Sequence, residues 1–306
     1  MIRPLTESDL PAMTNLCAKA LPLEPLTWTP ALVREKSFGD RDFDPELMLG
    51  FETGGALRGF AVGVAKDHLG ERRAWTRLFA VNPAWMGQGI GTALIDEVER
   101  RCAARGATRI GVMDAIPNYL TPGVDFRYTP AICFFTKRKY EKRGVNTNLM
   151  CDLLADPYGD CDAAIVNLGK KGFEVRRAEA TDRAMCAAWA EKEFKGWMEE
   201  IDACFKNDPI SLWICVDRRE GRREMIGFSA YDSNNLDTGF YGPLGVGPAT
   251  RGHGAGALLT RLCLRDQKRQ GHRQAVIPWV GPVRFYQKTC GAWMDRQFWA
   301  FEKKLA

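Results

Sequence analysis

The sequence has little of what several common kinds of site require. It contains three histidines in 306 residues, and its ten cysteines stand apart from one another without a CxxC pair. That spacing suits neither a zinc site nor a disulfide framework. It predicts reduced thiols in the core or on the surface, and no bound metal.

Long apolar runs and a strong excess of one charge are also missing. No run approaches the roughly 18 residues needed to cross a bilayer, and the first nine residues, MIRPLTESD, lack the apolar region of a signal peptide. The net charge is +5, with Lys and Arg spread along the chain. We therefore expect a cytoplasmic protein without membrane or nucleic-acid partners, whose mild positive charge suits a small anionic ligand.

The most informative stretch is YGPLGVGPATRGHGAGALL, residues 241–259. It reads as a short strand ending at Val246, a Pro/Gly turn, and a glycine-rich loop that leads directly into an amphipathic helix. The first amides of a helix have no partner inside it and attract anions. Gly252, Gly254 and Gly256 would let a diphosphate approach those amides closely. The stretch predicts a phosphate cradle, with an ordinary tight turn as the alternative.

Two common phosphate loops do not fit this stretch. A P-loop needs the sequence GK[ST], which does not occur here. A Rossmann fingerprint needs its third glycine three positions after the second, where this chain has Ala257.

A degenerate copy of the stretch lies 165 positions earlier, where Val81, Gly89 and Gly91 match Val246, Gly254 and Gly256. The flanking patterns recur in the same order, which predicts a tandem repeat. The expected elements are hairpins (47–53 with 56–65, and 211–217 with 225–231), glycine-loop helices (89–105 and 254–270) and apolar strands (109–114 and 274–278). Each half then carries an aromatic pair before a lysine, in the sequences FFTK (134–137) and FYQK (285–288).

Arg251, Gly254 and Gly256 resemble the acyl-CoA pyrophosphate loop of the GNAT superfamily of N-acyltransferases, whose pattern is [R/Q]-x-x-G-x-[G/A] after a strand ending in Val. The resemblance implies an α/β (α+β) fold with two tandem GNAT-like domains. Each would be a mixed, mostly antiparallel sheet with helices on both faces and splayed central strands. We expect a degenerate N-terminal domain (1–154), a linker (155–172) and a catalytic C-terminal domain (173–306).

The resemblance further implies an acetyl-CoA-dependent N-acetyltransferase, monomeric or homodimeric, that acts on a small-molecule amine. Tyr286 is implied as the acid that assists the leaving thiolate. Coenzyme A would be bound by the second glycine loop and the strand before it, that is, by Leu244, Gly245, Val246, Arg251, Gly252, His253, Gly254, Ala255, Gly256 and Ala257. Weaker candidates in the first half are Val81, Gly87, Gln88, Gly89, Ile90, Gly91 and Thr92.

The first half departs from the family pattern, because Phe135 replaces the tyrosine, Met86 the arginine and Lys139 a glycine. One strong CoA site is therefore expected, in the second half. No carboxylate stands where many family members carry a general base, which leaves ordered water, Asp232 or Asp237 as alternatives. An aminosugar, a polyamine and a peptide N-terminus all remain possible acceptors. A catalytically silent acyl-CoA-binding or regulatory module is the alternative function.

Overall fold

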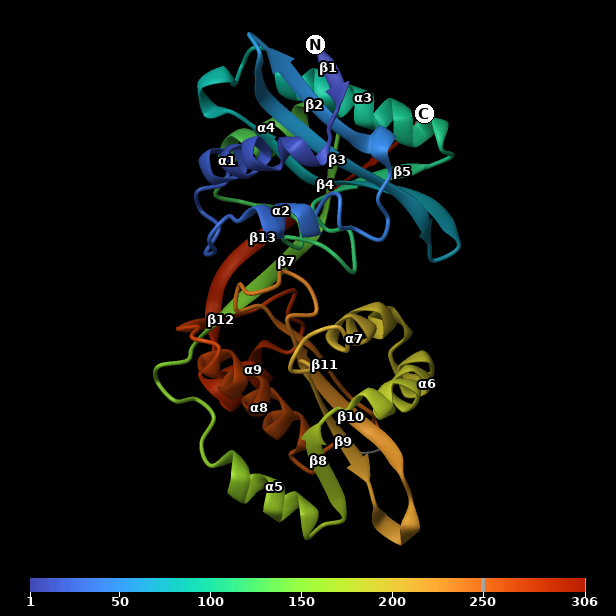
Figure 1. Cartoon of the computed structure of the whole chain (residues 1–306), viewed down its shortest axis with the longest axis vertical. Helices are drawn as coiled ribbons and strands as arrows, with labels where there is room; N and C mark the ends of the chain where they lie inside the picture. Colours follow the sequence, from blue (N-terminus) through green and yellow to red (C-terminus); the bar gives the residue numbers. More distant parts are fainter. Residues whose placement is uncertain (249–250, 306) are drawn as a thin grey trace. The chain divides into compact units, whose positions relative to one another are not determined.

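The computed structural model of the chain describes residues 1–248 and 251–305 (Figure 1). The chain forms two compact units, which we call the N-terminal unit (Met1–Asn146 with Gln297–Ala306) and the C-terminal unit (Thr147–Arg296). Each unit is an α/β structure, as the sequence predicts.

The N-terminal unit is built on a mixed sheet in the order β1-β2-β3-β4-β5-β13, in which the described pairs are antiparallel except for β4–β5. Its strands are β1 (Ile2–Pro4), β2 (Met48–Thr53), β3 (Ala56–His68), β4 (Glu71–Val81), β5 (Arg109–Val112), β6 (Val124–Asp125) and the last part of β13 (Trp293–Lys304). Its helices are α1 (Leu10–Ala20), α2 (Pro30–Glu35), α3 (Ile90–Ala104) and α4 (Thr129–Lys137).

Helix α3 packs on this sheet through the apolar stripe that its sequence predicts. Ile90, Leu94, Val98 and Cys102 are all buried, together with Ile95. Gly59 of β3 lies so close to α3 that a Cβ there would meet the side chains of Ile90 and Leu94 at 3.1 and 3.3 Å. Burial of each large aliphatic side chain stabilises the fold by about 1.5–3 kcal/mol, so this stripe fixes the helix and the loop that precedes it.

The C-terminal unit contains the antiparallel sheet β11-β10-β9-β8, and its strand β12 pairs with β7. Its strands are β7 (Glu141–Asp152, in its last part), β8 (Phe173–Arg177), β9 (Leu212–Asp217), β10 (Glu224–Tyr231), β11 (Tyr241–Val246) and β12 (Gln274–Ile277). Its helices are α5 (Cys161–Gly169), α6 (Arg183–Glu193), α7 (Met198–Cys204), α8 (Ala255–Arg269) and α9 (Val283–Cys290).

The two faces of β9 belong to different hydrophobic clusters. Trp213 and Cys215 pack with residues of α8 and α9, whereas Ile214 and Val216 pack with residues of α6 and α7. Side chains of a strand alternate between the two faces of its sheet, so helices cover both faces, as the sequence predicts (Figure 1).

The chain is divided differently from the expected domains, because two strands are exchanged. Strand β7 follows α4 of the N-terminal unit, yet its end pairs with β12, where Asp152 lies opposite Gln274. Strand β13 follows α9 of the C-terminal unit, yet its end pairs with β5, where Lys304 lies opposite Arg109. The expected boundary after residue 154 gave each half its own last strand. The internal repeat could not reveal this exchange, because each half of the sequence contains the same strands whichever unit they join.

The expected linker, residues 155–172, is part of the C-terminal unit. Tyr158, Cys161 and Leu168 are buried in the cluster that includes α8, and the side chain of Asp160 caps helix α5 by accepting from the Ala163 N–H at 2.8 Å. The glycines of this segment suggested a linker, but its apolar residues have the spacing of a packed helix.

Candidate functional site

The central strands of the N-terminal unit separate at their carboxyl ends. The last parallel pair of β4 and β5 is Thr76 with Val112, and β4 then continues to Val81 while β5 ends. Met113 has a left-handed backbone (φ 71°), and its N–H donates to the Thr76 carbonyl at 2.8 Å. The left-handed residue directs the chain away from β4, and the predicted splay is therefore confirmed in this unit.

A cavity of about 1260 Å³ follows this gap and reaches the first glycine loop. Val81, Gly87, Gly89, Gly91 and Thr92, five of the seven weaker candidates, line it. The other two do not: the Ile90 side chain is buried in the core, and Gln88 is exposed. Aromatic and basic side chains complete the lining, including Phe79, Trp85, Tyr128, Phe134, Phe135, Lys137, Arg138 and Lys303.

The glycines of the first loop have two different roles. Gly87 and Gly89 have φ values of 77° and 82°, and a Cβ on either would meet nothing within 4 Å, so the backbone there is both left-handed and open. A Cβ on Gly91 would instead meet the rings of Phe79 and Phe134 at 3.2 and 3.5 Å. The first turn of α3 carries no acidic residue, which leaves its amides suitable for an anion.

The second loop repeats this backbone. Gly252 and Gly254 have φ values of 91° and 89° with open space above them, while a Cβ on Gly256 would meet Val246 at 3.3 Å and Phe285 at 3.7 Å. Ala255 is buried and Ala257 half-buried, and the first turn of α8 also has no acidic residue. Ala249 and Thr250, which precede Arg251 in the sequence, lie outside the described residues.

Two side chains of the second loop have neighbours at its edges. The exposed Arg251 donates from Nε to the carbonyl of Val246 at 3.3 Å. The His253 ring lies 5.0 Å from the ring of Phe173, at the start of β8. The loop therefore faces solvent on the side where an anion would approach, and it rests against β8 and β11.

Strand β11 contains a bulge. Its pairing with β10 shifts between Tyr241 and Leu244, which places Gly242 and Pro243 in the bulge. Beyond it, Leu244, Gly245 and Val246 continue the pairing with β10. In the part of the chain that the structure describes, one isolated parallel bridge, from Phe240 to Val276, joins this strand region to β12, so these two strands also separate beyond that contact.

Tyr286 is almost completely buried on α9, and its ring contacts those of Tyr241 and Phe285 at 5.9 and 5.0 Å. Burial raises the pKa of its phenol above the usual range, and a hydrogen bond with Tyr241 offsets part of the rise. The phenol is therefore protonated at neutral pH. Phe135 has the corresponding place on α4, among the rings of Phe79, Phe134, Tyr140 and Phe301, and offers no proton donor.

The bulge of β4 carries Arg77, at one of the positions where the family pattern offers a base. The pairing of β4 with β3 shifts between Thr76 and Leu78, and Arg77 is the extra residue. Its guanidinium is fully buried and pairs with Asp40, and with Asp42 at 3.6 Å. In the N-terminal unit, this position is therefore occupied by a buried arginine whose charge is paired with aspartates.

The two aspartates suggested from the sequence differ in exposure. Asp237 is exposed, whereas Asp232 is buried, and its Oδ2 accepts from the Gln270 side chain at 3.1 Å. Sequence reasoning missed a third carboxyl, Glu200 on α7. Burial raises its pKa to about 8, with a smaller contribution from Glu199. Its signal in the sequence is weak, because it differs from the exposed Glu199 only by its place on the helix.

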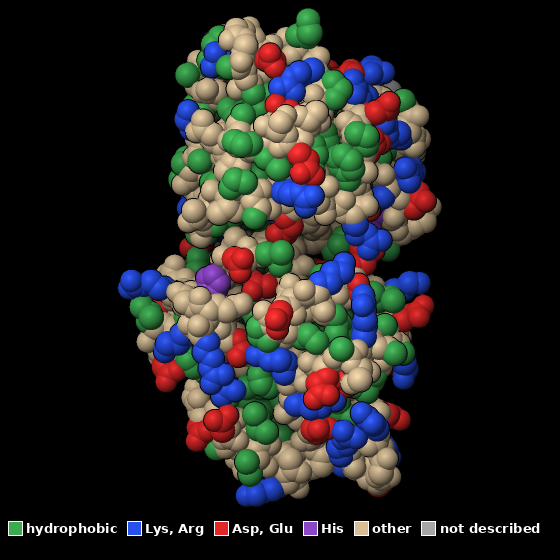
Figure 2. Space-filling view, viewed as in Figure 1, with side chains coloured by type: hydrophobic (Ala, Val, Ile, Leu, Met, Phe, Trp, Pro, Cys, Tyr) green, Lys and Arg blue, Asp and Glu red, His purple; other side chains and the backbone are tan. Residues whose placement is uncertain are grey.

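No group of three or more His, Cys, Asp or Glu side chains is placed to hold a metal ion within residues 1–248 and 251–305. The ten cysteines are free, nine of them buried and Cys133 exposed. No helix in the described part of the chain is long and apolar enough to span a membrane. On the face drawn in Figure 2, Lys and Arg side chains lie among Asp and Glu side chains on each unit.

Curated relatives match part of the chain. An acetyltransferase of Yersinia enterocolitica is 34% identical over 70 residues, and an uncharacterized N-acetyltransferase of Yersinia pestis is 33% identical over 70 residues. Each match covers 23% of this chain and 47% of the relative, so the chain spans about half the length of the relatives it matches.

Solved structures share the fold over the whole chain. A glucosamine N-acetyltransferase region of a fungal multi-domain β-N-acetylglucosaminidase has a TM-score of 0.80 at 18% identity, covering 99% of this chain and 38% of that one. A tandem GNAT protein from the clavulanic acid biosynthesis pathway has a TM-score of 0.72 at 16% identity, covering 100% and 98%. The sequence model of the acetyltransferase (GNAT) family matches residues 13–126 and 178–292, more than half of the chain. The chain therefore belongs to the acetyltransferase (GNAT) family, with one match in each unit.

Proposed function

We propose that the chain transfers an acetyl group from acetyl-CoA to a primary amine of a small molecule. The observation that carries the cofactor in this proposal is the cavity of about 1260 Å³ in the N-terminal unit, which joins the gap between β4 and β5 to the open amides of a glycine loop. Such a cavity suits an elongated ligand with a diphosphate at one end. The second glycine loop has the same left-handed glycines and the same open space.

Within this proposal, acetyl transfer takes place in the C-terminal unit. Arg251 and the amides of residues 252–257 would bind the diphosphate of coenzyme A, with His253 at the edge of the loop. The amine attacks the thioester carbonyl, whose oxygen becomes an oxyanion before the C–S bond breaks. A backbone N–H of β11 between Leu244 and Val246 would stabilise that oxyanion, because the bulge at Gly242 and Pro243 frees this part of the strand from β12.

Tyr286 would assist the leaving sulfur. A phenol that is protonated at neutral pH can donate a hydrogen bond to a developing thiolate. Its raised pKa opposes complete proton transfer to a thiol whose ordinary pKa is near 8.5. We therefore propose that Tyr286 stabilises the thiolate by a hydrogen bond, and that water completes the proton transfer.

The amine must lose a proton before or during its attack. Ordered water would accept this proton, since Glu200, with a pKa of about 8, already holds its own proton near neutral pH.

The N-terminal unit has a different part in this proposal. It would bind acyl-CoA in its cavity through Val81, Gly87, Gly89, Gly91 and Thr92, but Phe135 cannot assist the leaving thiolate. A silent acyl-CoA-binding half within an active chain is therefore favoured over two equal active sites. The open cavity supports binding in this unit, in contrast to the weak or empty site expected from the sequence.

The decisive experiment measures release of free thiol from acetyl-CoA with a panel of three amines, namely glucosamine, spermidine and a peptide with a free N-terminus. The fungal neighbour described as a glucosamine N-acetyltransferase region makes glucosamine the first to test. We expect turnover with at least one amine, loss of turnover in Tyr286→Phe, and retention in Tyr158→Phe. Tyr158 is a matched control in the same unit, whose hydroxyl donates to the Leu153 carbonyl at 2.6 Å. Binding of acetyl-CoA without turnover across the panel would favour the silent module.

A further inference from the structure

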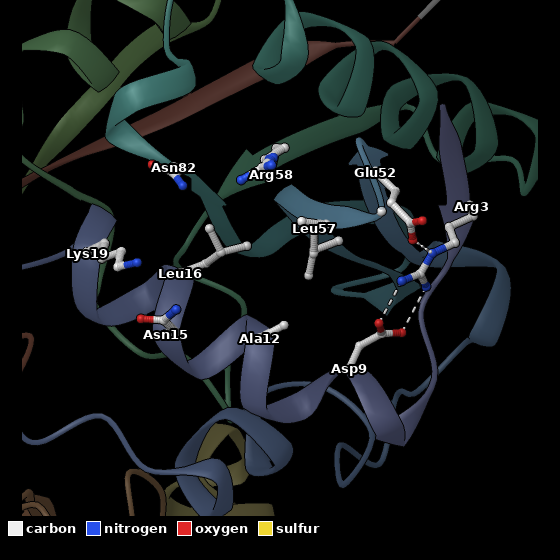
Figure 3. Close-up of a pocket in the computed structure, with 12 residues that line it drawn as sticks. Arg3, Asp9, Ala12, Asn15, Leu16, Lys19, Glu52, Leu57, Arg58 and Asn82 are labelled. Carbon is white, nitrogen blue, oxygen red and sulfur yellow. Dashed lines mark hydrogen bonds and ion pairs between the residues drawn. The ribbon is translucent and has the colours of Figure 1, made fainter.

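The N-terminal unit contains a second cavity, of about 410 Å³, between helix α1 and the hairpin of β2 and β3 (Figure 3). We call it the α1–β3 groove. It is separate from the cavity of about 1260 Å³, which we call the acyl-CoA cavity, although Lys19 lines both. The groove has two polar ends with an apolar middle, and the two ends differ in their chemistry.

One end is a complete ion-pair network. Arg3 donates to both carboxylate oxygens of Asp9 at 2.9 and 2.7 Å and to Glu52 at 2.6 Å, as the dashed lines in Figure 3 mark. The C-terminal unit repeats this pair, since Arg176 donates to both oxygens of Asp182 at 2.6 and 2.8 Å. A pair that occurs in both units has a structural role, so this end of the groove is not specific to a ligand.

The other end presents donors that lack acceptors. Within the described residues, neither Lys19 nor Arg58 forms an ion pair, and the buried Nε of Arg58 has no hydrogen-bond partner. The Oδ1 atom of Asn82 accepts from the Ala84 N–H at 3.1 Å, which leaves the amide NH₂ group of Asn82 to donate. Two cations and an amide donor on facing walls select for an anion, and a guanidinium can bind a carboxylate through two parallel hydrogen bonds.

The C-terminal unit shows that the fold does not need these residues. The Asn82 N–H donates to the Arg58 carbonyl at 2.8 Å, and the matching bond in the other unit runs from Gly247 to Ile226 at 2.9 Å. The register agrees, because Gly59 pairs with Val81 as Gly227 pairs with Val246. A buried isoleucine and a glycine thus occupy the positions of Arg58 and Asn82, so the polar end is particular to the N-terminal unit.

The middle of the groove is apolar, with Leu16 of α1 facing Leu57 of β3 between the two ends (Figure 3). A route to the acyl-CoA cavity leads through Trp85. The Arg58 guanidinium carbon lies 4.5 Å from the centre of the Trp85 ring, and Trp85 also lines the acyl-CoA cavity. An anion that moves Arg58 would therefore change one wall of that cavity.

We propose that the α1–β3 groove binds a small organic carboxylate with a short apolar chain. The carboxylate pairs with Arg58 and Lys19, the chain lies between Leu16 and Leu57, and occupancy changes the affinity of the acyl-CoA cavity through Arg58 and Trp85. The inference goes beyond the proposed function, because binding to the groove requires no acetyl transfer.

The test is calorimetric titration of the full chain with sodium butyrate. We expect saturable binding that Arg58→Gln weakens by about 10- to 100-fold, the usual effect of losing a pair of charge-assisted hydrogen bonds. Arg100→Gln is the matched control, since Arg100 is an exposed arginine of the same unit that pairs with Glu97 and does not line the groove. Lys19→Gln, on the solvent-exposed side of α1, is a second variant that tests the site if Arg58→Gln does not fold.

Further titrations distinguish the groove from the acyl-CoA cavity and from a general anion site. Saturating CoA should leave butyrate bound, and butyrate should change the CoA dissociation constant in the wild type but not in Arg58→Gln. Displacement of butyrate by CoA, equal affinity in wild type and Arg58→Gln, or tighter binding of inorganic phosphate than of butyrate would each overturn the proposal. These outcomes are independent of turnover, so failure here is distinguishable from failure of the proposed acetyl transfer.

Discussion

The two units begin their glycine-loop helices in the same way but differ around the gap that each loop faces. Both helices follow a left-handed glycine, Gly89 or Gly254, and both are 15 residues long. In the N-terminal unit the residues in question are Phe135 on α4 and the buried Arg77 in the bulge of β4. In the C-terminal unit the corresponding residues are Tyr286 and Gly242. The backbone of the glycine loop is therefore shared, while the side chains around the gap are not.

Three buried side chains, Lys36, Arg77 and Glu200, illustrate two ways in which the fold accommodates a buried ionisable group. Lys36 is fully buried in the N-terminal unit and pairs with Glu35 at 2.7 Å, and Arg77 pairs with Asp40, so each buried cation has a partner. In the C-terminal unit, α7 buries Glu200 beside Ile201 and Cys204, and burial raises the pKa of that carboxyl to about 8. A buried charge with a partner keeps its protonation state, whereas burial without a charged partner keeps the Glu200 carboxyl protonated up to a higher pH.

The largest expected effect comes from removing the hydroxyl of Tyr286, because the N-terminal unit has Phe135 at the corresponding position. Tyr286→Phe should lower kcat by about 10²- to 10⁴-fold with little change in acetyl-CoA affinity, because the ring still packs against Tyr241 and Phe285. Single-turnover thiol release is the measurement, since it isolates the chemical step from product release. Wild-type rates in that assay would show that sulfur leaves without help from this residue.

The glycine loops provide a matched pair of variants. Gly254→Val and Gly89→Val each place a β-branched side chain at a positive φ, in the open space above the loop. A change of the loop that costs the bound state about 1–3 kcal/mol should weaken CoA binding there by about 5- to 150-fold. Calorimetric titration of the wild type should show two CoA sites, and each variant should lose one of them. A single site that disappears in Gly254→Val alone would support the sequence-based expectation of one strong CoA site, in the C-terminal unit.

Glu200→Gln should stabilise the C-terminal unit in a pH-dependent way. The folded-state pKa of about 8 lies above the unfolded value of roughly 4.3, so the folded protein holds a proton that the unfolded chain releases, and stability falls as pH rises between these values. The variant has no such proton, so its Tm should exceed the wild-type Tm by several degrees at pH 8 and by less at pH 5. Glu199→Gln, at the exposed neighbouring position, should show no such trend.

The sequence predicted local features well and long-range ones poorly. The positions of Ile90, Leu94 and Val98 predicted which face of α3 is buried, because helical periodicity depends on near neighbours alone. It did not predict the exchange of β7 and β13, since strand pairing depends on which distant edge is free. It also missed Glu200, whose burial results from the packing of α7 and not from its local sequence.

The smallest expected effect tests whether the N-terminal unit lacks only its hydroxyl. Phe135→Tyr restores the residue type of the other half, but Met86 still stands in place of Arg251 and Arg77 still fills the bulge of β4. Adding Phe135→Tyr to Tyr286→Phe should therefore leave single-turnover thiol release as slow as in Tyr286→Phe alone. The new hydroxyl would enter a cluster of aromatic rings, where a polar group without a partner destabilises by about 1–3 kcal/mol, so a slightly lower Tm is expected as well. Recovery of even a tenth of the wild-type rate in the double variant would contradict this expectation. It would mean that the missing hydroxyl alone makes the N-terminal unit inactive, and that Met86 and Arg77 do not prevent the reaction.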